Sequence, residues 1–304
     1  MSFSTETKSE LCRVKADRKG SISALCYGIL LYCHTFTAEE IRIITACADF
    51  AAILPKLFRR GFGVSFDRLP KENAGGKLSF VITDREKIRR IAAAFGADVD
   101  GLISHHVNFA ALEEERDRLA YIRGAFLAGG SVSDPEKGFH LELATTHRSV
   151  SRETYSLLVD MGYEPKESER GANSLIYFKK ADNIADLLTA IGADVASMNV
   201  INAKVEREMR NTITRQINCD SANADKVVAA AQEQIDAIRY IAREYGLDAL
   251  SEPLKDAALL RLTNPEASLA DLAQLSSPKV TKSSLSYRLK KIVDYADEAR
   301  SFEE

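Results

Sequence analysis

The alternation of hydrophobic and polar positions predicts one series of elements that occurs twice along the chain. Each copy begins with an apolar helix and continues with a hairpin, a second helix and a second hairpin. It ends with a helix whose apolar residues recur at i, i+3, i+4 and i+7. The helices are predicted at 21–33, 45–60 and 88–95 in the first copy, and at 116–129, 151–161 and 184–191 in the second. We therefore expect an α+β domain made of two αββαββα copies, each with its own sheet of about four strands.

The two copies correspond at an offset of 96 residues near both of their ends, so they are one duplicated module rather than the units of a solenoid. Their second hairpins turn at stretches rich in turn-forming residues, KENAGG (71–76) and SERGAN (168–173). In the first helix of each copy, small residues occupy every fourth position. They are Ala24 and Gly28 in one copy, and Ala120, Gly124 and Ala128 in the other. Small residues along one stripe let two helix backbones approach closely, so we expect these helices to pack against each other across a pseudo-twofold axis.

From Asn202 onward the pattern is helical throughout. We expect helices at 203–217, 221–246 and 251–263, followed by two shorter ones. Ser268 with Asp271 three residues later is a helix-start signal, and SSPKV (276–280) interrupts the helix that follows. The next helix is predicted to begin near Thr281 and Lys282. Two short helices joined by a tight break, the second more basic than the first, fit a helix-turn-helix at about 267–300.

Charge singles out this last segment. The whole chain has a net charge of -3, yet residues 276–292 contain five basic residues and no acid. Such a local basic surface favours nucleic acid as the partner, because recognition needs only one patch. The candidate DNA-binding residues are Lys279, Thr281, Lys282, Ser283, Ser286, Tyr287, Arg288, Lys290 and Lys291.

Within this set, residue type predicts role. Ser283, Ser286 and Tyr287 are expected at base edges. Lys282, Lys290 and Lys291 are expected at phosphates. Arg288 fits either role. The alternative is a helical hairpin whose basic face is merely solvated.

The combination of these features resembles one bacterial family. Two αββαββα copies, the second carrying FLAGGSV (126–132), look like a LAGLIDADG homing endonuclease domain. With the C-terminal helix-turn-helix and the joining segment at 202–228, nearly the whole chain resembles the WhiA family. This resemblance implies a DNA-binding regulator of cell division and chromosome segregation in Gram-positive-type bacteria, active in sporulation in some relatives. It also implies that the endonuclease-like domain is not catalytic. Ser286 and Tyr287 stand where the family usually has Asn and His, which puts the preferred DNA site in doubt.

The residues themselves also argue against cleavage. Metal-dependent nucleases need carboxylates at the ends of the paired helices, because Mg²⁺ prefers oxygen ligands. Here those ends read CHTF (33–36) and GGSV (129–132), without an acid. The nearest carboxylates, Glu39 and Asp134, lie in the hairpins, and Asp134 precedes a proline as in a turn. We therefore predict no catalytic residue, no metal, no cofactor and no enzymatic activity. An active endonuclease remains an alternative.

Composition also limits where the protein can act and what state its cysteines take. The N-terminal twenty residues lack the apolar segment of a signal peptide, and no apolar run is long enough to span a membrane. The five cysteines show no CxxC spacing, so we expect reduced thiols packed in the core. A cytoplasmic, nucleoid-associated protein with double-stranded DNA as partner follows. The endonuclease-like sheets could contact DNA through residues such as Arg42 and Arg170, or could bind a protein, in which case the chain would be a scaffold tethered to DNA.

These expectations divide the chain into four parts. The first copy is expected at 1–105 and the second at 106–200. A linker helix at 201–225 then leads to the helical DNA-binding domain at 226–304.

Overall fold

The computed structural model describes residues 2–15, 18–71, 76–96 and 105–301. The chain divides into two compact units, Met1–Glu208 and Met209–Glu304. In the described part of the chain, no helix combines the length and the apolar character needed to cross a membrane.

The first unit contains the duplicated module, and its order of elements follows the predicted series. The first copy comprises α1 (Phe3–Leu11), α2 (Lys19–Leu31), β1 (Thr35–Phe36), β2 (Ile41–Thr45), α3 (Ala48–Phe62), β3 (Leu78–Ile82) and α4 (Arg85–Ala93). The second comprises η1 (Phe109–Leu112), α5 (Glu115–Gly129), β4 (Gly130–Val132), β5 (Leu141–Thr145), α6 (Arg148–Asp160), β6 (Lys166–Arg170), β7 (Asn173–Phe178) and α7 (Ala181–Ile191). The α+β fold with two similar halves is therefore confirmed.

The two sheets differ in one respect that the sequence did not predict. The second sheet is antiparallel with the order β4-β5-β7-β6, and has the four strands expected. In the described residues of the first copy the sheet has three strands, β1-β2-β3, and a single bridge between Arg68 and Val81 stands where the fourth was expected. The backbone N–H groups of Asp67 and Arg68 both donate to the carbonyl of Val81, and Pro70 has no N–H to continue a ladder. The predicted turn at 71–76 lies largely outside the described residues.

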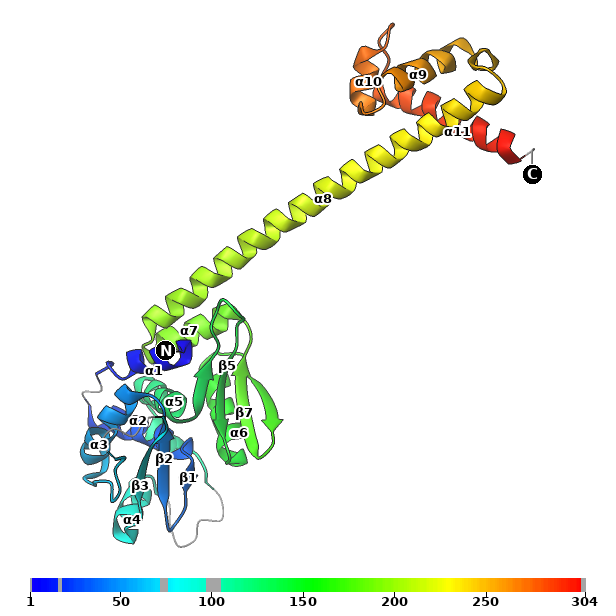
Figure 1. Ribbon diagram of the computed structural model, residues 1–304. Coiled ribbons are helices and arrows are strands. Elements are labelled where there is room, and N and C mark those ends of the chain that lie inside the picture. Colours follow the sequence, from blue (N-terminus) through cyan, green and yellow to red (C-terminus); the bar gives the residue numbers. More distant parts are fainter. Residues whose placement is uncertain (1, 16–17, 72–75, 97–104, 302–304) are drawn as a thin grey trace. The chain divides into compact units, whose positions relative to one another are not determined.

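The paired small-residue helices are confirmed as the closest backbone contact between the copies. Helices α2 and α5 lie side by side (Figure 1). A Cβ atom added to Gly28 would lie 2.0 Å from the carbonyl oxygen of Tyr121, and one added to Gly124 would lie 2.0 Å from that of Leu25. Both pairs are related by the 96-residue offset of the repeat, so the contact is symmetric. Only glycine fits at these two positions, because the opposing backbone occupies the space of a side chain.

Helix α1 was not predicted, and it ties the ends of the first unit together. Its Glu10 carboxylate accepts hydrogen bonds from the backbone N–H groups of Val195 (2.7 Å) and Ala196 (3.1 Å). These are orphan donors in the first turn of helix α8 (Asp194–Glu244). The Ser4 hydroxyl accepts a third hydrogen bond, from the N–H of Val132, at 3.3 Å. A carboxylate at a helix N-terminus also interacts favourably with the helix dipole, so Glu10 serves as the cap of α8.

The cysteines follow the expectation in part. All five are free thiols, and Cys26, Cys33 and Cys47 are buried in the core of the first unit, as predicted. Cys12 is half-buried and packs against the same core. Cys219 is exposed on α8, so the core prediction is wrong there.

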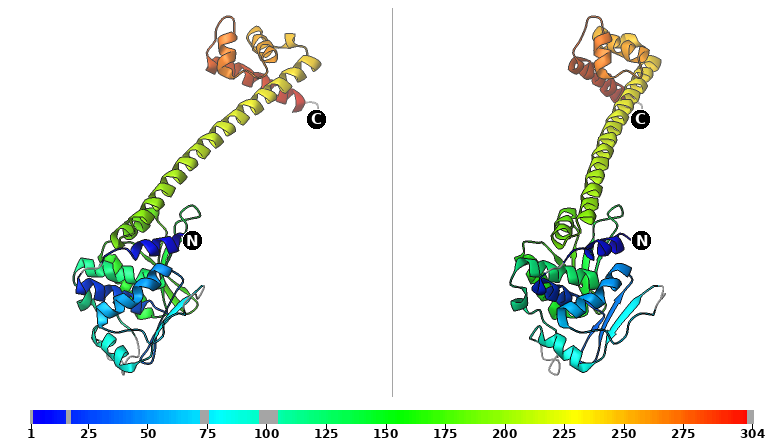
Figure 2. Two further views of the ribbon diagram at one scale, coloured as in Figure 1. Left: turned by 60° about the vertical axis from the view of Figure 1, so that its left-hand side comes forward. Right: turned by 90° about the vertical axis from the view of Figure 1, so that its left-hand side faces the viewer.

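The second unit is entirely helical. In both views of Figure 2 its short helices gather at the C-terminal end of α8. They are η2 (Leu247–Ala249), α9 (Glu252–Thr263), α10 (Leu269–Leu275) and α11 (Lys282–Ser301). Ile238 and Ile241 of α8 pack with Leu272, Leu285 and Leu289 in its core. The helices expected at 203–217 and 221–246 form one continuous helix, because no glycine or proline occurs between them to interrupt the backbone.

We predict that Gly28→Ala destabilises the first unit by about 2–3 kcal/mol or more, because the new methyl group would overlap the carbonyl of Tyr121. The expected fall in Tm is about 5–10 °C, measured by thermal unfolding. The matched control is Gly138→Ala. A Cβ atom at Gly138 would meet no heavy atom within 4 Å, so that variant should melt with the parent. Equal melting of all three proteins would contradict the close helix contact.

A histidine pair joins the two copies. The His105 ring stacks on Phe36 of the first copy, and His105 Nε2 donates to the Phe36 carbonyl oxygen at 2.6 Å. The rings of His105 and His147 meet edge to face, with 4.3 Å between their centroids. Among the described residues, the buried Nε2 atom of His147 has no hydrogen-bond partner. Burial, together with the charge that His105 can carry, lowers the pKa of His147 to about 4.

This pKa makes stability depend on pH with a definite sign. Because the folded pKa lies below the usual value of 6.5, the stabilisation is complete above pH 6.5 and is lost as pH falls from about 6.5 toward about 4. The free energy of unfolding of the parent should fall between pH 7.5 and pH 5, and in His147→Gln we expect this fall to be about 1 kcal/mol smaller. This difference is less than the full pKa shift would give, because solvent partly screens the charge of the ring. Urea unfolding at the two pH values measures this. An identical loss in both proteins would contradict the assignment.

Candidate nucleic-acid interface

Helix α10 begins and ends as the sequence predicted. The Ser268 hydroxyl caps its start by accepting from the N–H of Asp271 and by donating to the Asp271 carboxylate at 2.7 Å. After Leu275 the chain leaves the helix at the predicted break. The Ser276 hydroxyl donates to the carbonyl of Ala273 at 2.8 Å and accepts from the N–H of Val280 at 3.0 Å. One side chain therefore closes the turn between the two helices.

Helix α11 begins at Lys282, with Thr281 as its cap. The Thr281 hydroxyl accepts a hydrogen bond from the N–H of Ser284 at 3.1 Å. The acid-free stretch 276–292 covers the turn and the first eleven residues of this helix. The positive end of the helix dipole and the basic side chains therefore occur together, an arrangement that favours anionic ligands such as phosphate.

The faces of α11 are clearly separated. Leu285, Leu289 and Ile292 are buried against α9 and α10. The opposite face, about half a turn away, is exposed and carries Ser283, Tyr287, Lys290 and Lys291. The Tyr287 side chain is 61% exposed, and the Lys291 ammonium lies 5.2 Å from the centre of its ring. An aromatic ring held by a cation and surrounded by lysines is suited to nucleic-acid contact.

The other predicted residues lie around this face. Lys279 and Lys282 are exposed at the turn and at the helix start, while Ser286 is half-buried at the margin of the face. Arg288 is set apart from the others. It is half-buried and lines a cavity of about 300 Å³ together with Leu259 and Leu275. The structure thus brings most of the predicted set onto one face and the adjoining turn, and places Arg288 at the edge toward α9.

Sequence reasoning missed one residue that positions the interface. Arg261 on α9 is 2% exposed, and its guanidinium donates to the Gln234 side chain at 3.0 Å and to the Ala267 carbonyl at 2.6 Å. Burial lowers its pKa below the usual value. These bonds hold the loop that leads directly to the Ser268 cap. The available signal was one arginine among the leucines at the C-terminal end of α9, which a solvated position would have explained equally well.

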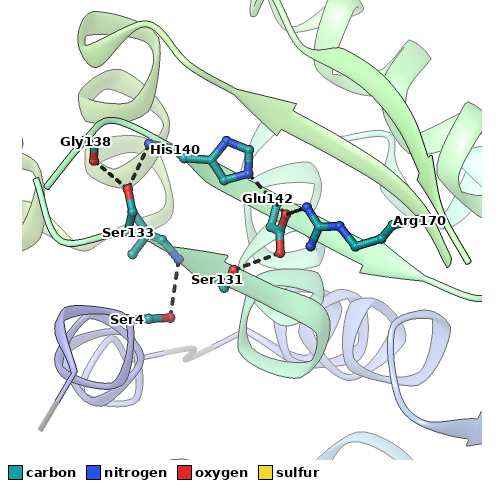
Figure 3. A network of polar contacts seen from close by, with 8 residues as sticks. Ser4, Ser131, Ser133, Gly138, His140, Glu142 and Arg170 are labelled. Atoms are coloured by element: carbon teal, nitrogen blue, oxygen red, sulfur yellow. Dashed lines mark hydrogen bonds and ion pairs between the residues drawn. The ribbon is translucent and has the colours of Figure 1, made fainter.

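The exposed face of the second sheet is electrically mixed. Figure 3 shows Glu142 on β5 among Ser131, His140 and Arg170, with His140 Nε2 at 3.1 Å and Arg170 at 3.3 Å from its carboxylate. Burial raises the pKa of Glu142, but the His140 hydrogen bond and the Arg170 charge outweigh it, so the net pKa lies below the usual value. Arg170 is therefore one half of an ion pair.

Two other cations near the strands are paired in the same way. Arg42 lies 2.6 Å from Glu40, and Lys180 lies 2.6 Å from Glu164. Their carboxylate partners compensate these cations locally, whereas the start of α11 carries its cations over an acid-free stretch.

The paired helices end close to the predicted residues. Helix α2 ends before Tyr32 and Cys33, and α5 ends at Gly129. Asp134 forms a turn, its carboxylate accepting from the N–H of Glu136 at 3.1 Å. In residues 2–15, 18–71, 76–96 and 105–301, no group of three or more His, Cys, Asp or Glu side chains is arranged to hold a metal ion.

Comparisons with known proteins agree with this architecture. A family model described as the WhiA C-terminal HTH domain matches residues 213–296, and one described as the WhiA LAGLIDADG-like domain matches 118–210. The probable cell division protein WhiA of Clostridium perfringens is 33% identical over 313 residues, covering 99% of each chain. Its counterpart in Clostridium acetobutylicum is 34% identical over the same length, again covering 99% of each chain.

Solved structures show the same fold. The crystal structure of full-length DUF199/WhiA from Thermatoga maritima matches with a TM-score of 0.60 and 22% identity, covering 98% of this chain and 99% of that one. The crystal structure of the N-terminal LAGLIDADG domain of DUF199/WhiA matches with a TM-score of 0.50 and 19% identity, covering 63% of this chain and 92% of that one. With relatives above 30% identity along its whole length, this chain belongs to the WhiA family.

Proposed function

We propose that this protein is a sequence-specific, non-enzymatic regulator that binds double-stranded DNA through α10 and α11. The observation that carries the proposal is the exposed, acid-free basic face of α11, which follows directly on a capped helix and a tight turn. In a helix-turn-helix the second helix enters the major groove and its N-terminal residues meet the bases. The WhiA HTH domain recognised over 213–296 supports this docking.

The positions of the side chains support distinct roles within this proposal. Ser283, Ser286 and Tyr287 belong to the first two turns of α11 and would read base edges. Lys282, Lys290 and Lys291 would contact phosphates on either side. Thr281 would act mainly by capping the helix, since its hydroxyl already accepts the N–H of Ser284. Lys279 in the turn and Arg288 beside α9 would reach the neighbouring backbone.

The proposed cellular role rests on the relatives. They are named probable cell division proteins, which supports a role in cell division through transcription, and we extend it to chromosome segregation. Such a protein would act in the cytoplasm, on the nucleoid. The mixed charge of the second sheet favours a protein partner over DNA for that surface.

We predict that Lys282→Glu combined with Lys290→Glu abolishes DNA binding, because two phosphate contacts become repulsive. Measured by fluorescence anisotropy on duplex DNA, affinity should fall by at least about a hundredfold, and neutral variants at both sites should lower the salt slope by about two. The control is Arg239→Glu with Arg243→Glu, which makes the same charge change at exposed positions of α8. Parent-like affinity in the lysine variant, with unchanged Tm, would refute the proposal.

The competing function is an active endonuclease, which the family fold alone does not exclude. The absence of a carboxylate at the ends of α2 and α5 supports a non-catalytic domain. We therefore expect supercoiled plasmid and genomic DNA to stay intact with the protein in the presence of Mg²⁺ or Mn²⁺, as judged by gel electrophoresis. Cleavage that Asp134→Ala or Glu39→Ala removes would overturn this expectation.

A further inference from the structure

A second surface with the chemistry of DNA recognition lies on α8, within the second unit. Residues 209–219 contain no acid, and they include Arg210 and Arg215. Every residue from Met209 to Ala229 is exposed, so no part of this stretch serves the core of the unit. Acids bound this stretch on both sides, since Glu208 precedes it and Asp220 follows it.

The composition of this stretch is unfavourable for a helix that only connects. Eight of the fifteen residues 211–225 are Asn, Asp, Ser or Thr, which are poor helix formers because their side chains compete for backbone hydrogen bonds. The following residues, 226–244, are instead rich in Ala, Ile, Glu and Gln. A helix that only connected two units would be more stable with alanine than with asparagine or threonine at these positions. The polar side chains therefore call for a role of their own.

Their spacing places several of them on one side of the helix. Residues at i, i+3, i+4 and i+7 share a face, and the apolar side chains of Met209, Ile213 and Ile217 lie on the other side. This α8 polar face consists of Asn211, Thr214, Arg215 and Asn218. Within the part of the chain that the structure describes, none of these four side chains has a hydrogen-bond or ion-pair partner. Amide, hydroxyl and guanidinium groups are thus presented to solvent together.

We propose that the α8 polar face is a second contact surface for double-stranded DNA, in addition to α11. Asn forms paired hydrogen bonds with adenine and Arg with guanine or phosphate, and an α-helix of this kind fits the major groove. The lack of acid between Met209 and Cys219 gives charge complementarity to the phosphates of DNA. The inference rests on the proposed DNA-binding function and adds to it a second set of residues that determine which sequence is bound.

The test compares two pairs of amides on the same helix. In the full-length chain, Asn211→Ala with Asn218→Ala removes two amides from the polar face, and Gln216→Ala with Asn223→Ala removes two from other sides of the helix. Alanine favours the helix, so neither pair can weaken binding by unfolding it, and circular dichroism verifies this. On duplexes that the parent selects from a random 30-bp library, the first pair should bind at least about tenfold more weakly. The second pair should bind as the parent does.

The charged member of the face gives an independent readout. Arg215→Gln should reduce the slope of log affinity against log salt by about one if the guanidinium meets a phosphate, and should relax base preference at one position if it meets guanine. Parent-like affinity, salt slope and base preference in all of these α8 variants would overturn the inference. If the α11 lysine variant still loses binding in that case, the proposed function stands. If the parent selects no duplex, both fail.

Discussion

The close crossing of α2 and α5 is the contact on which the first unit depends. At Gly28 and Gly124 each helix places its backbone where the other would carry a side chain. The two glycine contacts correspond to each other in the repeat. Nearby, residues at corresponding positions of the two copies contact each other directly. The Ser21 hydroxyl donates to the Asp117 carboxylate at 2.7 Å, and Arg18 pairs with Glu114 at 3.3 Å. A pseudo-twofold axis therefore passes between the helices, and each sheet is positioned by the helix that precedes it.

The end of α5, beyond this crossing, is also closely packed. Where α5 ends, a Cβ atom on Gly129 would lie 2.3 Å from the carbonyl oxygen of Ala144 and 3.1 Å from the ring of Tyr32. The backbone of β5 and an aromatic side chain thus fill the space next to the helix end, and a carboxylate at this position would have no room. The end of α5 is therefore closely packed against β5 and Tyr32.

Charge is organised differently in the two units. The chain as a whole is slightly acidic, and three cations near the strands of the first unit, Arg42, Arg170 and Lys180, pair with neighbouring carboxylates. In the second unit, α11 and the exposed stretch of α8 each present basic residues over an acid-free stretch of sequence. An acidic surface elsewhere does not oppose such patches strongly, because salt screens charges beyond about 10 Å. Buried Arg261 holds the loop before α10, so the position of the basic patch depends on an interaction in the core.

The sequence by itself determined the duplicated series of elements, the small-residue stripes, the cap at Ser268, and the basic helix start. Each of these rests on local periodicity or on side chains that bond within one turn. Only the tertiary structure decided that Glu10 caps a helix 185 residues away, that Arg261 is buried, and that Arg170 is neutralised by Glu142. It also decided that the first sheet has three strands in its described residues. These features depend on partners distant in sequence, and local pattern contains no information about which distant groups a fold will bring together.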